Sequence, residues 1–180
     1  CTFSRIASGP DVDFAGTSYM NGPEDPGIYF LDPQMRWQRH YDSQHGNAAS
    51  VLPEGMPLPV LTKVPGAPYK HGTTWFADSV SSWRYHPDCT LFYGRFKQMV
   101  LVHMFPPRSN VIPFMSPSGG GSQPDGRPNP AWDWRVTLTR GVTSEAEVRF
   151  ATRAIYKRFV SNDDILAEYR RWVATLSPTP

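Results

Sequence analysis

The sequence predicts an all-β domain, an antiparallel β-sandwich or jelly-roll-like fold with long loops and one C-terminal α-helix. Three observations support this prediction. The 180-residue chain contains 19 prolines and 14 glycines, which interrupt helices and mark turns. Several segments alternate apolar and polar residues with the two-residue period of strands. Helical periodicity is found near the C-terminus only. We expect a single domain over residues 1–176 and a frayed tail at 177–180.

The first half of the expected scaffold consists of short strands and one hairpin. Residues 12–18 alternate weakly, and residues 28–31 form a short apolar run between turn residues. Residues 91–96 and 99–105 are the best hairpin candidate, but the connecting Lys97-Gln98 lacks the Gly or Asn of a tight turn, which favours a longer one. Because the run 99–105 is apolar on both faces, we expect a central strand covered on both sides.

The second half adds two strands and the helix. Residues 132–138 alternate as in a half-buried strand, and residues 145–159 repeat this pattern with one solvated face. Ser161 or Asn162 can cap a helix with acidic residues in its first turn. Its apolar stripe comprises Ile165, Leu166, Tyr169, Trp172, Val173 and Leu176.

Charge and motifs exclude several classes of function. The 18 basic and 16 acidic residues give a net charge of +2. The sequence contains no Lys/Arg run of the kind that marks nucleic-acid binding. No apolar run approaches the roughly 20 residues of a membrane span, and no signal-peptide pattern is present. Neither a Gly-x-Ser-x-Gly elbow nor a P-loop occurs, and Cys89 has no catalytic base at a readable spacing, so a Ser or Cys hydrolase is not predicted.

The chain begins at Cys1, so we expect either a processed protein or an upstream segment of the same protein. A lipoprotein, which begins at a lipidated Cys, is the less favoured alternative, because strand-like alternation starts at once rather than after a polar tether. Cys1 and Cys89 are the only cysteines, and two cysteines do not define a disulfide framework. The compartment therefore stays open, although a carbohydrate ligand would favour a secreted or periplasmic protein.

Residues 36–87 are the region where we expect chemistry. They hold four of the five histidines and three of the six tryptophans, with almost no strand or helix periodicity. Disordered segments are normally poor in aromatic residues. We therefore expect ordered loops that pack over the scaffold and carry binding groups.

The candidate catalytic residues are His45, His71, Tyr93 and Arg95. Tyr93 and Arg95 are two residues apart on an expected strand, so they project from the same face. A His or Tyr would act as the base, and Arg95 would neutralise a carboxylate. The candidate substrate-binding residues, which supply stacking rings and hydrogen bonds, are Trp37, His40, Tyr41, Tyr69, Trp75, Trp83 and Arg84.

No metal or other cofactor is predicted. His40 and His45 are five residues apart, which places them on one face of neither a helix nor a strand, and no metal-binding motif occurs. A transition-metal site would have to be assembled from distant residues, for example His45, His71 and His103. For His103, a buried, hydrogen-bonded role in the core is the favoured interpretation.

Four segments resemble an uncharacterised group of bacterial proteins whose members carry more sequence before the point where this chain starts. They are Pro23–Phe30, His45–Ser50, Pro53–Gly55 and Tyr93–Phe96, and the resemblance covers most of the chain. No activity is attached to this group. The sequence also broadly resembles those of the large β-sandwiches of polysaccharide-active enzymes, including the galactose-mutarotase-like supersandwich. That similarity implies a carbohydrate ligand held by His, Tyr and Arg side chains.

We therefore expect a protein that interacts with a carbohydrate or uronate polysaccharide and has no nucleic-acid partner. If it is an enzyme, a polysaccharide lyase is favoured over a glycoside hydrolase, since nothing brings two of the carboxylates Asp42, Glu54 and Asp78 to a set separation. The alternative is a non-catalytic carbohydrate-binding or structural domain of a larger protein.

Overall fold

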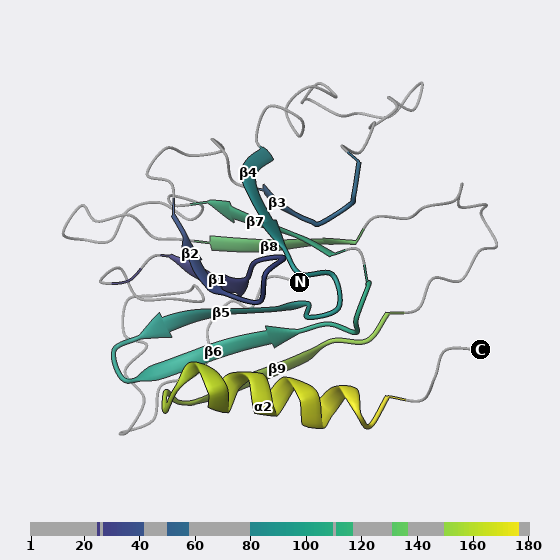
Figure 1. Ribbon diagram of the computed structural model, residues 1–180. Helices are drawn as coiled ribbons and strands as arrows, with labels where there is room; N and C mark the ends of the chain where they lie inside the picture. The colour runs from purple at the N-terminus through teal and green to yellow at the C-terminus, as the bar shows by residue number, and fades with distance from the viewer. Residues whose placement is uncertain are drawn as a thin grey trace, which may run out of the picture.

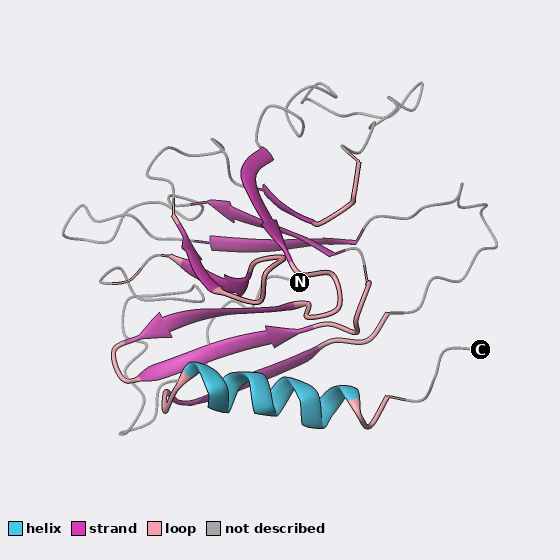
Figure 2. Cartoon of the chain, viewed as in Figure 1, coloured by secondary structure: helices cyan, strands magenta, loops and turns pink. Residues whose placement is uncertain are grey.

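The computed structural model describes residues 25, 27–41, 50–57, 80–109, 111–116, 131–136 and 150–176. In this part the chain consists of strands followed by one C-terminal helix (Figures 1 and 2). The elements in chain order are β1 (Ile28–Leu31), β2 (Trp37–His40), β3 (Ser50–Pro53), β4 (Val80–Tyr85), β5 (Leu91–Phe96), β6 (Met99–Met104), β7 (Val111–Ser116), β8 (Ala131–Val136), β9 (Arg153–Arg158) and α2 (Asn162–Val173). The predicted β-rich class with a C-terminal helix is confirmed.

The strands form two sheets. The five-stranded sheet has the order β2-β1-β5-β6-β9, and the four-stranded sheet has the order β4-β3-β7-β8. All the described strand pairs are antiparallel except β3 and β4, which run parallel. This parallel pair places the starts of β3 and β4 at the same end of the four-stranded sheet.

Each face of the five-stranded sheet contributes to a separate core. Helix α2 lies beside β6 and β9 and covers one face (Figure 1). The helix-side core comprises Leu31, Cys89, Leu91, Tyr93, Val100, Val102, Met104, Ile165 and Tyr169. The opposite face shares a second core with the four-stranded sheet. This inter-sheet core comprises Ile28, Phe30, Val51, Tyr85, Phe92, Leu101, Phe105 and Val111.

Helix α2 begins and docks as predicted. Ser161 is the N-cap, and its hydroxyl accepts a hydrogen bond from the Asp164 N–H at 3.1 Å. Ile165 and Tyr169 are the buried residues of the apolar stripe. The Tyr169 hydroxyl accepts from the Thr90 N–H at 3.1 Å and lies 3.2 Å from the Phe105 carbonyl oxygen, to which it donates. The helix is therefore anchored to the ends of β5 and β6 by hydrogen bonds as well as by apolar packing.

The β5–β6 hairpin is confirmed, but the expected longer turn is wrong. Phe96 pairs with Met99, so Lys97 and Gln98 form a two-residue turn. Lys97 adopts a φ of 47°, a conformation that Gly or Asn reaches at lower cost. The central position of β6 is also confirmed, because its alternate residues enter the helix-side and inter-sheet cores.

Residues 36–87 are not only loops, because β2, β3 and β4 lie among them. Two of these strands have four residues each, too few for an alternating pattern to be recognised. At the C-terminal side, the described strand within 145–159 is shorter than expected, since β9 begins at Arg153 and Phe150 lies outside it. Residues 12–18, 145–149 and 177–180 lie outside the described residues.

The β1–β2 turn is organised by the carboxylate of Asp32. It accepts hydrogen bonds from the backbone N–H groups of Gln34 and Arg36, both at 2.9 Å, and from the side chains of Arg36 and Gln38. Burial alone would raise the pKa of Asp32, but these hydrogen bonds outweigh it and lower the pKa to about 2. Asp32 is therefore ionised at neutral pH and fixes the turn.

Candidate functional site

The edge strand β4 contains a bulge that sets it apart from the other strands. Ser50 of β3 pairs with Val80, and Leu52 pairs with Arg84. The three residues 81–83 of β4 therefore lie opposite Val51 alone, which gives β4 two extra residues. Bulges bend a strand and redirect side chains, and they are frequent next to functional sites.

Side chains of β4 itself hold this bulge in place. The Trp83 N–H donates to the Ser81 hydroxyl oxygen at 3.1 Å. The Arg84 guanidinium donates from Nη1 to two carbonyl oxygens, at 2.7 Å to Ser81 and 2.8 Å to Trp83. These bonds tie two side chains of β4, the edge strand of the described four-stranded sheet, to the backbone of the same strand.

Trp83 is presented at this edge with part of its ring in solvent. Its exposed fraction is 39%, and its ring meets the edge of Phe30 with centroids 6.5 Å apart. Phe30 belongs to the inter-sheet core, so Trp83 is anchored on one side and accessible on another. The contact with Phe30 restricts the orientation of the indole, while part of its ring stays accessible to solvent.

The first residues of β3 and β4, Ser50 and Val80, are strand partners. In the sequence, segment 42–49 precedes Ser50 and segment 58–79 precedes Val80. The predicted site residues His45, Tyr69, His71 and Trp75 belong to these segments and lie outside the described residues. Ser50 is fully buried, and its hydroxyl has no hydrogen-bond partner in the part of the chain that the structure describes.

Tyr93 and Arg95 share a strand face as predicted, and it is the face that α2 covers. The ring of Phe159 lies 6.1 Å from the Tyr93 ring and 4.0 Å from the Arg95 guanidinium carbon. The Tyr93 hydroxyl donates to Asn162 Oδ1 at 2.6 Å, and its ring stacks on Tyr29 at 4.6 Å. Burial raises the pKa of Tyr93 above its ordinary value. Tyr93 is thus a packed, neutral group that links β5 to α2.

The predicted binding residues of β2 do not join Trp83. Trp37 packs edge-on against Tyr93, with ring centroids 5.5 Å apart, on the side of α2. His40 is buried and pairs with Ile28, whose side chain enters the inter-sheet core. Tyr41 packs against that core and lies 5.9 Å from the Arg39 guanidinium carbon. Of the described candidates, Trp83 and Arg84 are the two that belong to β4, the edge strand of the four-stranded sheet.

His103 occupies the space between the sheets. It is 2% exposed, and its ring stacks on Trp134 with centroids 5.0 Å apart. Desolvation lowers the pKa of His103 to about 4, so the ring is neutral at physiological pH. Among the described residues, no three His, Cys, Asp or Glu side chains are arranged to hold a metal ion. His45 and His71, the other members of the predicted metal set, lie outside the described residues.

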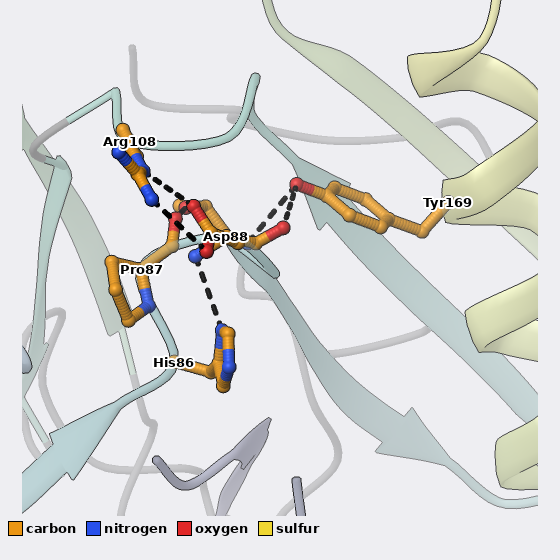
Figure 3. Close-up of polar contacts among 6 residues, drawn as sticks. His86, Pro87, Asp88, Arg108 and Tyr169 are labelled. Carbon is orange, nitrogen blue, oxygen red and sulfur yellow. Dashed lines mark hydrogen bonds and ion pairs between the residues drawn. The ribbon is translucent and has the colours of Figure 1, made fainter.

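A second polar cluster follows β4 and has a structural role (Figure 3). The Asp88 N–H donates to His86 Nδ1 at 3.1 Å, and Arg108 Nε donates to the Asp88 carboxylate at 2.6 Å. Arg108 has a φ of 58°, and its N–H donates to the Pro87 carbonyl at 2.8 Å. Tyr169 approaches the Asp88 carbonyl from α2 at 3.5 Å (Figure 3). These contacts join two turns to the helix.

The remaining candidate residues are the three carboxylates and Cys89, and two of the carboxylates lie outside the described residues. Of the three carboxylates considered for glycoside hydrolysis, Glu54 lies in the exposed turn after β3, and Asp42 and Asp78 lie outside the described residues. Cys89 is buried with a free thiol, and burial raises the pKa of that thiol to about 12. It is therefore a packing residue rather than a nucleophile.

Sequence reasoning identified Trp83 and Arg84 but missed Ser81. The available signal was a serine two residues before a tryptophan, because Ser hydroxyls bond nearby backbone N–H groups and interrupt a strand. No helix in the described residues has the length and apolar character needed to cross a bilayer. Comparisons with family models, curated proteins and solved structures found no match to this chain.

Proposed function

We propose that this protein is a non-catalytic carbohydrate-binding domain that uses Trp83 as a stacking platform, on a scaffold of the β-sandwich or jelly-roll type. The observation that carries the proposal is the bulge in β4, which holds a half-exposed indole at the edge of a sheet. The face of a pyranose ring is apolar along its C–H groups, and its rim is polar. A fixed aromatic face beside backbone and side-chain polar groups matches that pattern.

The position of the site at the start of the parallel pair supports a carbohydrate ligand. Ser50 and Val80 follow directly on the segments 42–49 and 58–79, which contain His45, Asn47, Tyr69, His71 and Trp75. These residue types hydrogen-bond hydroxyl groups and stack on sugar rings. Their attachment points and the Trp83 bulge belong to the same pair of strands.

Binding without catalysis is favoured because of the geometry of Tyr93. A general base must reach its proton within hydrogen-bond distance, whereas the Tyr93 hydroxyl is buried against Asn162. Arg95 lies over Phe159 on the helix side, whereas Trp83 meets Phe30 of the inter-sheet core. Elimination from a uronate would therefore need a base from residues other than Tyr93.

The test measures binding of the whole chain to neutral oligosaccharides (glucan, xylan, mannan) and to acidic ones (galacturonan, alginate). We expect Trp83→Ala to weaken binding by at least about tenfold, the ratio that corresponds to roughly 1.4 kcal/mol. Phe150→Ala is the matched control, because Phe150 is an aromatic residue with an exposed fraction of 61% outside the β4 bulge. It should leave the affinity unchanged.

The same incubations report catalysis through the ultraviolet absorbance of the unsaturated elimination product. Binding without product in any member of the panel supports the binding domain. Product from galacturonan or alginate would show that the protein is a lyase and not a non-catalytic binding domain. Failure of every oligosaccharide to bind would refute the proposal.

A further inference from the structure

Within the β4 bulge, the guanidinium of Arg84 bonds the backbone of its own strand. Nη1 of Arg84 donates to the carbonyl oxygens of Ser81 and Trp83. A planar guanidinium that bridges two carbonyls holds them at a fixed separation. Arg84 therefore acts on the backbone on both sides of Ser82, within the bulge.

Ser81 binds the backbone N–H of Trp83, in the same segment of β4. Its hydroxyl accepts the Trp83 N–H at 3.1 Å, a bond that closes a short turn within the strand. The N–H of Trp83 donates to the Ser81 hydroxyl oxygen, and its C=O accepts from the Arg84 guanidinium, so both groups bond to side chains of β4. The orientation of the indole is thus set locally, by the residues on each side of it.

We infer that Arg84 and Ser81 are positioning residues for Trp83, and that the site recognises the apolar face of a sugar ring whether or not the sugar carries a carboxylate. This inference rests on the proposed function. It differs from the sequence-based expectation that Arg84 bonds the ligand itself, because a positioning role affects neutral and acidic sugars equally.

The experiment combines a readout of Trp83 with a matched pair of ligands. Incorporation of 5-fluorotryptophan places a fluorine on each of the six tryptophans, and Trp83→Phe assigns the resonance of Trp83. The ligands are a galacturonan oligosaccharide, whose carboxylates are charged, and its neutral methyl ester. The variants are Arg84→Gln, Arg84→Lys and Ser81→Ala, with Arg158→Gln as the control for loss of one exposed positive charge on β9.

We expect Arg84→Gln and Ser81→Ala to shift or broaden the Trp83 resonance and to weaken both ligands by the same factor, about fivefold for the loss of one hydrogen bond. Arg84→Lys should not restore the affinity, since an ammonium keeps the charge without the planar fork. Arg158→Gln should change neither readout.

An unchanged Trp83 resonance in both Arg84→Gln and Ser81→Ala would overturn the inference. Selective loss of the acidic ligand, with rescue by Arg84→Lys, would also overturn it and would make Arg84 a direct contact. If the unmodified protein binds neither ligand while the resonance responds to the substitutions, the proposed function fails and the positioning role stands.

Discussion

Single hydroxyl groups have opposite roles in this protein, depending on whether they have a partner. Ser161 caps α2 by accepting the Asp164 N–H, whereas the Ser50 hydroxyl is fully buried and has no partner among the described residues. A buried, unpaired hydroxyl costs free energy that a bonded one recovers. The identical substitution should therefore have opposite effects at the two positions.

We expect Ser50→Ala to leave the free energy of unfolding unchanged or to raise it by about 1 kcal/mol, because it removes an unpaired polar group. Ser161→Ala should lower it by about 1 kcal/mol through loss of the helix cap. Urea denaturation of both variants measures these changes. A clear loss of stability in Ser50→Ala would mean that the hydroxyl binds a partner such as a buried water.

At the scale of the elements, the sequence predicted best where the pattern was long. Helix α2 has twelve residues with a cap, charged ends and an apolar stripe, and each strand of the β5–β6 hairpin is a six-residue run of mainly aromatic and branched residues. Strands β2 and β3 have four residues each, and the bulge in β4 interrupts its alternation. These strands depend on tertiary pairing, which a local pattern does not encode.

In the candidate site, too, the sequence predicted the features that depend on local pattern and missed those that depend on tertiary pairing. Alternation correctly placed Tyr93 and Arg95 on one face of β5, but it does not tell which layer covers that face. Trp83 and Arg84 were identified from their residue types, whereas the role of Ser81 depends on a register shift between β3 and β4. That shift arises from strand pairing between residues about 30 positions apart.

The hydroxyls of Tyr169 and Tyr93 attach α2 to the sheet and provide an element-level prediction. Tyr169→Phe leaves the buried Thr90 N–H without its acceptor, so we expect a loss of about 1–3 kcal/mol. Tyr93→Phe removes one bond to Asn162 and should cost about 1 kcal/mol. Chemical denaturation gives both values.

The same Tyr93→Phe variant separates a packing role from a catalytic one. Because Tyr93 lies on the helix side, we expect unchanged carbohydrate affinity in the folded variant. Loss of carbohydrate binding, at retained stability, would place Tyr93 in the functional site.

At the scale of the whole molecule, the five-stranded sheet lies between α2 and the four-stranded sheet, and His103 is sealed in the inter-sheet layer. Its folded pKa of about 4 lies below the ordinary value of 6.5. The ring is neutral in both states above pH 6.5. As the pH falls from 6.5 toward 4, the unfolded chain binds the proton first, so stability is lost.

We expect this one group to reduce the free energy of unfolding by up to about 3 kcal/mol between pH 6.5 and 4. The measurement compares urea denaturation of the unmodified protein and His103→Phe across this range. The variant should lack that part of the pH dependence, and equal slopes for both proteins would show that His103 titrates normally in the folded state.

Chemical-shift mapping of backbone amides with each oligosaccharide of the panel tests whether a sugar ring binds at the Trp83 edge of the four-stranded sheet. We expect the largest perturbations within residues 81–84, with none at residues 93–95 or in α2. Perturbations centred on Tyr93, Arg95 and α2, or none with any oligosaccharide, would contradict this expectation.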